Sequence, residues 1–186
     1  MEKLLSKVLF IVMLSSYLFA SDEVMLLDTS GSLNNPSTVK EIKKLVKRYL
    51  ALGKSIIAFN DDSYSVKSID DLRFGGGTAT AKALKAILND NYRYVVIVTD
   101  GESEDNTATI KQANLLKARG IKICSVFLSD SETTVPEALS QISDKVFRSA
   151  NIEAAFAMCT SSKTKEKILG KSAVVKIVDD SHFDLF

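Results

Sequence analysis

The chain has little of several residue types, and each shortage excludes a class of protein. Its 186 residues include no Trp and only two Pro, which argues against long Pro-rich or irregular regions. Lys and Arg number 24 against 23 Asp and Glu, so the basic excess typical of a nucleic-acid binder is missing. The remaining composition is ordinary for a globular protein, and the length suits one domain that buries a full core without help from disulfides.

The N-terminus differs from the rest of the chain. Lys3 and Lys7 precede a short apolar run over 8–14, and a small residue then stands before a polar pair. This layout predicts a secretory signal peptide over 1–20, because the run is too short to span a membrane. The alternative is an uncleaved N-terminal anchor, since Leu18 suits the position three residues before cleavage poorly.

No second apolar stretch is long enough to cross a bilayer, so no membrane span is expected after cleavage. We therefore expect an exported protein, periplasmic or secreted, and the Lys-rich, Trp-free composition indicates a bacterial source. The domain organisation follows as a signal peptide over 1–20, one folded domain over 21–168 and a C-terminal extension over 169–186.

Alternating strand and helix patterns predict the fold class. Apolar or alternating runs predict strands at 24–28, 55–59, 64–69, 94–99, 121–128 and 145–148. Helical spacing predicts helices at 37–52, 78–89, 107–119, 136–142 and 151–168, and Thr38 and Glu41 have capping-box spacing. Residues 174–178 fit either a further strand or a packed tail. The order indicates an α/β, doubly wound, mostly parallel central sheet with one antiparallel edge strand, 64–69, and helices on both faces.

Polar residues follow the two best strands at the point where each strand ends. In the segment Asp28-Thr29-Ser30-Gly31-Ser32, the first, third and fifth side chains can point at one centre. Thr78 follows three glycines and adds a hydroxyl, and Asp100 adds a second carboxylate. All these donors are hard oxygens, which suit Mg²⁺, Mn²⁺ or Ca²⁺ and not zinc or copper. Two carboxylates leave an open or water-filled position on the ion, which a partner's carboxylate could fill.

The three segments D-T-S-G-S, G-G-T and V-V-I-V-T-D-G, in this order, resemble a von Willebrand factor type A (vWA) domain. The resemblance covers residues 24–168 and implies a Rossmann-like doubly wound sheet. It also implies a metal-ion-dependent adhesion site formed by Asp28, Ser30, Ser32, Thr78 and Asp100. In that family the two serines and often the threonine touch the metal, whereas the aspartates commonly act through water.

Each element of this pattern also has a structural explanation. Asp28 could be a turn residue, Thr78 a helix N-cap, and the glycines only a flexible turn. Glu102, Glu104 and Asp105 are expected to form a solvated acidic loop that caps the next helix. His182, the only histidine, is expected to be an exposed residue of the tail rather than a metal ligand.

The two cysteines, Cys124 and Cys159, allow a disulfide in an oxidising compartment. Two separate buried thiols are the alternative, and the position of Cys124 inside an apolar strand favours that alternative slightly. The sequence does not decide between them.

Three functions follow from these features. The favoured one is an exported module that binds a protein partner through a divalent metal. A structural subunit of an envelope assembly, with incidental metal, is the second. An enzyme is not expected, because a phosphohydrolase of the haloacid-dehalogenase kind needs a second Asp where Ser30 stands, and a serine hydrolase would have only His182 as its base.

Overall fold

The computed structural model describes residues 22–129, 134–160 and 176–177. Its strands are β1 (Glu23–Asp28), β2 (Ser55–Phe59), β3 (Ser63–Val66), β4 (Tyr94–Thr99), β5 (Lys122–Phe127), β6 (Lys145–Arg148) and β7 (Lys176–Ile177). Its helices are α2 (Pro36–Ala51), α3 (Thr80–Ala86), α4 (Asn106–Ala118), α5 (Glu137–Ile142) and α6 (Ile152–Thr160), with short 3₁₀ turns η1 (Gly31–Leu33) and η2 (Ile69–Asp71). Among these described residues, no helix is long and apolar enough to cross a membrane. The predicted signal peptide and most of the C-terminal extension lie outside the described residues.

One sheet runs through the molecule with the strand order β3-β2-β1-β4-β5-β6-β7. β1, β2, β4, β5 and β6 are parallel, and β3 pairs antiparallel with β2, which confirms the expected fold class. The two-residue β7 lies antiparallel to β6 at the other edge, so residues 176–177 form a strand rather than a packed tail. The chain order reverses between β1 and β4, the place where such sheets bind ligands.

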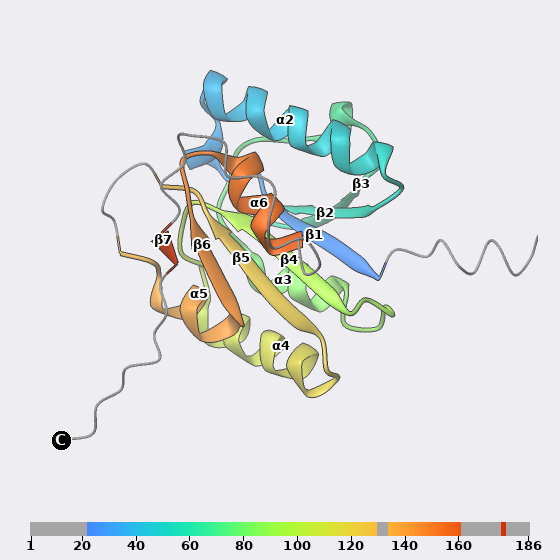
Figure 1. Ribbon diagram of the computed structural model, residues 1–186. Coiled ribbons are helices and arrows are strands. Elements are labelled where there is room, and N and C mark those ends of the chain that lie inside the picture. Colours follow the sequence, from blue (N-terminus) through green and yellow to red (C-terminus); the bar gives the residue numbers. More distant parts are fainter. Residues whose placement is uncertain (1–21, 130–133, 161–175, 178–186) are drawn as a thin grey trace, which may run out of the picture.

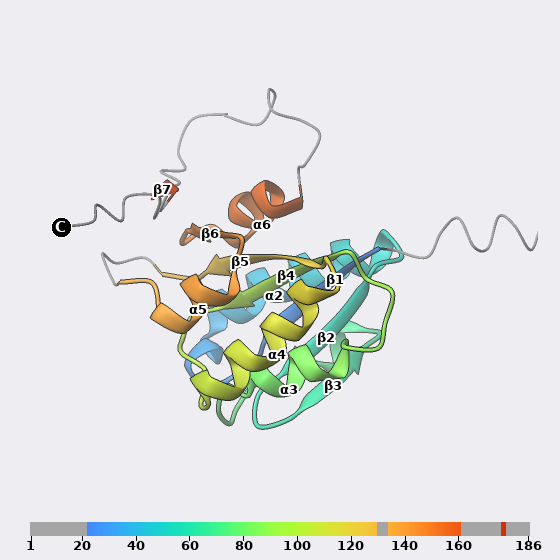
Figure 2. The same cartoon turned by 90° about the horizontal axis from the view of Figure 1, so that it is seen from below.

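Helices cover both faces of the sheet (Figures 1 and 2). α2 and α6 lie over one face, and α3, α4 and α5 lie over the other, as Figure 2 shows. Met25 and Leu27 of β1 belong to the core under α2 and α6, whereas Val24 and Leu26 belong to the core of the opposite face. The strand is therefore buried on both sides, which explains its continuous apolar sequence.

Helix α2 is held at both ends by polar contacts. Asn35, rather than Thr38, is its N-cap, because the Asn35 side chain accepts a hydrogen bond from the Thr38 backbone N–H. Near the other end, the Tyr49 hydroxyl and the Lys54 ammonium both donate to Glu23 Oε1, at 2.7 and 2.8 Å. The buried carboxylate at the start of β1 is thus neutralised and hydrogen-bonded, as burial requires.

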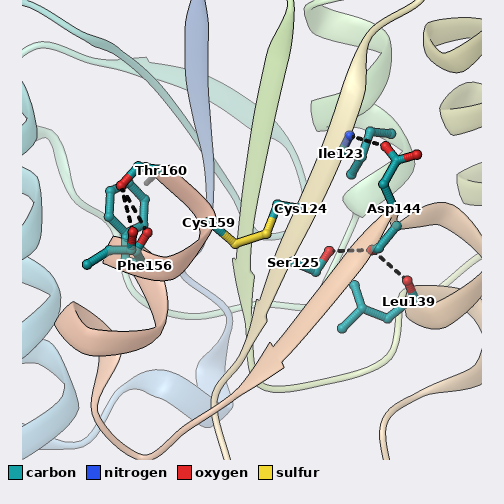
Figure 3. The surroundings of a disulfide bond; sticks show 10 residues. Ile123, Cys124, Ser125, Leu139, Asp144, Phe156, Cys159 and Thr160 are labelled. Atoms are coloured by element: carbon teal, nitrogen blue, oxygen red, sulfur yellow. Dashed lines mark hydrogen bonds between the residues drawn. A yellow bond between two sulfur atoms is a disulfide. The ribbon is translucent and has the colours of Figure 1, made fainter. Parts of the chain in front are cut away.

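A disulfide joins Cys124 of β5 to Cys159 of α6 (Figure 3). The slight preference for two separate thiols was wrong. Cys124 is only half-buried, and α6 lies over its strand, so that the two Cα atoms are 5.7 Å apart. The bond fastens the final described helix to the sheet.

Candidate metal centre

Asp28 ends β1 and is completely buried. Its Oδ1 accepts a hydrogen bond from the Ser30 backbone N–H at 2.8 Å, and its Oδ2 accepts one from the Thr99 hydroxyl at 2.6 Å. Thr99 is the last residue of β4, the strand beside β1. The carboxylate therefore fixes the turn after β1 and joins the ends of the two central strands.

Two serines and the second aspartate form a chain of hydrogen bonds above Asp28. The Ser32 hydroxyl donates to Asp100 Oδ1 at 2.9 Å. Since that hydroxyl has a single proton, the 3.0 Å contact between the Ser30 and Ser32 hydroxyls must be donated by Ser30. The chain Ser30, Ser32, Asp100 leaves oxygen lone pairs of both serines free to meet a cation.

The glycine-rich loop before α3 brings Thr78 to the same place. The Gly31 N–H donates to the Gly76 carbonyl at 3.0 Å, and the Gly75 N–H donates to the Thr29 carbonyl at 2.9 Å. These backbone bonds fix the two loops to each other. Helix α3 starts at Thr80, so Thr78 lies in the loop and is not the first helical residue as predicted. Its hydroxyl makes no hydrogen bond within the described part of the chain, which leaves it available to a ligand.

Two further carboxylates hold this loop from outside, and no sequence pattern predicted either role. Asp61 Oδ1, from the β2–β3 turn, accepts the Gly77 N–H at 2.7 Å. Glu104 Oε1, from the loop after β4, accepts the Thr78 N–H at 3.2 Å, and its own N–H donates to the Thr78 carbonyl. A Cβ on Gly77 would lie 1.4 Å from Glu104 Oε1, so only glycine permits this approach.

The acidic loop after β4 was expected to be solvated and to cap the next helix, but only one of its contacts has that role. Asp105 does cap α4, because its carboxylate accepts the Ala108 N–H at 2.8 Å. Glu104 instead supports the Thr78 loop. Prediction of the Glu104 contact from sequence would need knowledge that residues 26 positions apart are neighbours. His182 lies outside the described residues.

Burial raises the pKa of the Asp28 carboxyl, opposed by its hydrogen bonds with Thr99 and Ser30, and the charge of Asp100 adds to the rise. Burial likewise raises the pKa of Asp100, opposed by the Ser32 hydrogen bond. Without a cation, the site therefore contains two carboxylates that are ionised at a cost in free energy.

The donor set consists of two carboxylates and three hydroxyls, all oxygen. Within the described residues, no group of three or more His, Cys, Asp or Glu side chains could hold a metal. The arrangement therefore differs from a closed acidic cage. It fits a hard divalent cation that keeps part of its coordination sphere for water or for an external ligand.

Comparisons with known proteins agree with this fold. No protein-family model matches the chain. It is 27% identical over 198 aligned residues to the mouse collagen alpha-4(VI) chain, covering 87% of this chain and 8% of that protein. It also superimposes on proximal thread matrix protein 1 (PTMP1) from the mussel byssus, with a TM-score of 0.54 and 21% identity over 68% of this chain and 42% of that one. The chain folds as a vWA domain.

A third similar structure is the manganese-loaded TRAP protein of Plasmodium vivax, with a TM-score of 0.50 and 14% identity over 80% of this chain and 65% of that one. The chain thus spans less than half of PTMP1 and a small part of the collagen chain. The collagen and byssal names are those of matrix proteins, which supports the prediction that this chain is not an enzyme.

The metals in these relatives are divalent but not uniform. TRAP is loaded with manganese, and one PTMP1 structure has zinc in its metal-ion-dependent adhesion site (TM-score 0.55, 20% identity, 69% of this chain and 43% of that one). Zinc therefore occupies this kind of site in PTMP1, although oxygen donors of this type were expected to exclude it. A divalent ion agrees with these relatives, whereas magnesium in particular does not follow from them.

Proposed function

We propose that this vWA domain binds a protein partner through a divalent metal ion held by Asp28, Ser30, Ser32, Thr78 and Asp100. The main support is the chain of hydrogen bonds that links Ser30, Ser32 and Asp100. It lies at the edge of the sheet where the strand order reverses between β1 and β4. It joins residues from two separate loops into one oxygen-lined site. Mg²⁺ is the expected ion, with Mn²⁺ or Ca²⁺ as substitutes.

The partner is expected to supply a ligand and a negative charge that the protein's own side chains do not provide to the ion. Ser30 and Ser32 are neutral ligands, and a completely buried Asp28 that already accepts two hydrogen bonds is suited to act through water. A divalent ion so held keeps positive charge and at least one exchangeable position. A carboxylate from an Asp or Glu of the partner would supply both the missing ligand and the missing charge.

This encounter would take place outside the cytoplasm if residues 1–20 are a cleaved signal peptide. The disulfide supports export, because such bonds persist in oxidising compartments. Periplasmic or secreted location in a bacterium remains part of the proposal. A structural role in an extracellular or envelope assembly is the second candidate, favoured by the matrix proteins among the relatives. A metal-free variant that still assembles would support this second candidate.

The first experiment is thermal unfolding with and without metal across pH. In the metal-free folded state the pKa values of Asp28 and Asp100 are raised, so over a range of pH these carboxyls still hold protons that the unfolded chain has released. The stability of the metal-free protein therefore falls as pH rises through this range. A bound cation prefers the ionised carboxylates and removes this penalty. The increase in Tm on adding MgCl₂, MnCl₂ or CaCl₂ should therefore be larger at about pH 7.5 than at about pH 5. An unchanged Tm at every pH with all three salts would refute the metal site.

Partner binding is tested next, by retention of envelope or culture-fluid proteins on immobilised vWA domain. Retention should be lost with EDTA, return with Mg²⁺, and be absent for Asp28→Asn. A protein retained equally with EDTA would contradict metal-mediated binding.

Support of the Thr78 loop gives a separate prediction. In Gly77→Ala, the new Cβ must displace the Glu104 carboxylate from the Thr78 N–H. We expect Mg²⁺ affinity to fall about 10-fold, the usual order for loss of an outer support of a metal ligand, as measured by isothermal titration calorimetry. Gly101→Ala is the matched control, since its Cβ would meet nothing within 4 Å. Equal affinities of the two variants would show that the contact has no influence on the metal.

A further inference from the structure

A groove of about 300 Å³ begins at the metal centre and runs past the first turns of α2. Asp100 belongs both to the groove and to the metal centre. Its lining is mixed: the apolar members Leu33 and Ile152 are almost completely buried and Leu128 is half-buried, and polar side chains from the start of α2 line much of the rest. The volume is at the small end of ligand pockets and suits a few side chains of an extended segment.

Glu41 supplies the only charge in this groove besides Asp100, among the described residues that line it. The predicted capping box would have committed the Glu41 carboxylate to the start of α2. The N-cap is Asn35, however, and its side-chain oxygen already accepts from both the Ser37 hydroxyl and the Thr38 N–H. Glu41 therefore remains exposed and has no hydrogen-bond or ion-pair partner within the described part of the chain.

Among the described residues, no basic residue of α2 forms an ion pair with Glu41. Lys44, three positions along the helix, instead pairs with Glu153 of α6 at 3.0 Å. A cation at the metal centre would compensate Asp100 and leave Glu41 as the uncompensated charge of the groove. A ligand that enters the groove should accordingly carry positive charge at that point.

We propose that the groove binds a partner segment in which a basic residue lies close to the metal-binding acidic residue, with the Lys or Arg paired to Glu41. This inference rests on the proposed metal-dependent function and adds the charge pattern of the partner. The partner's Asp or Glu meets the ion, its chain lies along the groove, and its Lys or Arg reaches Glu41 on α2. An extended segment advances about 3.3 Å per residue, so the distance from the metal to Glu41 determines how many residues must separate the two charged residues of the partner.

The test uses short Ala/Gly peptides with a central Glu and one Lys moved stepwise along either side of it. Binding to the Mg²⁺-loaded domain is followed by NMR chemical-shift titration. One Lys position should bind about threefold to fivefold tighter than the parent peptide without Lys, the range of a single partly exposed ion pair. That preference should vanish in Glu41→Gln. In Glu41→Lys it should reverse in favour of the peptide with a second Glu at the same position.

Asp90→Asn is the matched control, because Asp90 is an exposed carboxylate of the loop between α3 and β4 and does not line the groove. It should leave the Lys preference unchanged. If peptides bind only with Mg²⁺ but every Lys position is equivalent in wild type and Glu41→Gln, the groove inference is overturned and the proposed function stands. If no peptide binds in a metal-dependent way, both are overturned.

Discussion

Asp28→Asn is expected to reduce Mg²⁺ affinity about 100-fold while leaving the metal-free protein as stable as wild type or more stable. The carboxylate is completely buried, and burial raises its pKa, so the metal-free wild type includes an ionised group in an unfavourable environment. Asparagine removes that charge. Its amide oxygen can still accept the Ser30 N–H, and its NH₂ can donate to Thr99, whose hydroxyl proton can turn to the Gly101 carbonyl.

The measurement pairs metal titration calorimetry with denaturant unfolding in EDTA. A variant that loses metal affinity and also unfolds in EDTA would indicate that Asp28 acts mainly in the fold. Retained affinity would exclude it from the metal centre. Asp90→Asn should match wild type in both measurements and controls for the loss of one surface charge.

Loss of the Cys124–Cys159 disulfide has the second largest expected effect, about 2–4 kcal/mol of unfolding free energy. The bond closes a loop with a sequence separation of 35 and ties α6 to β5. Both cysteines also pack against the apolar core under α2 and α6. Reduction therefore loosens the helix that covers this face, and denaturant unfolding with and without dithiothreitol should show a lower midpoint for the reduced protein.

The double variant Cys124→Ala, Cys159→Ala is the control for this measurement. Its midpoint should lie near that of the reduced wild type and should not respond to dithiothreitol. If reduction leaves the wild-type midpoint unchanged although free thiols appear, the covalent link contributes nothing and packing alone holds α6.

The sequence was sufficient for features that depend on local pattern. Continuous apolar runs such as 94–99 identified the buried strands, and the position of Asp28 directly after a strand placed it at the edge where ligands bind. The start of α3 was predicted two residues early, because a threonine after glycines looks like a helix cap. Thr78 instead belongs to a loop whose backbone N–H groups are held by Asp61 and Glu104.

Contacts between distant residues could not be predicted. Asp61 and Asp62 look alike in a polar turn, yet only Asp61 accepts the Gly77 N–H. Cys159 lies in a helix whose packing partner no sequence pattern identifies, so the choice between disulfide and free thiols stayed open. These features depend on which loops the folded sheet brings together, information that a single sequence does not contain.

The crowded glycine loop has a consequence for how this surface can be altered. Gly76 has φ +74°, and any side chain on Gly76 or Gly77 would collide with Asp61 or Glu104. Gly76 and Gly77 therefore cannot be replaced without displacing the Asp61 or Glu104 carboxylate that supports this side of the site. On the opposite side, the first turns of α2 carry Glu41, which is exposed and makes no hydrogen bond or ion pair within the described residues, so its replacement breaks no contact of the fold. Libraries that aim to redirect binding should therefore vary α2 and leave the glycines untouched.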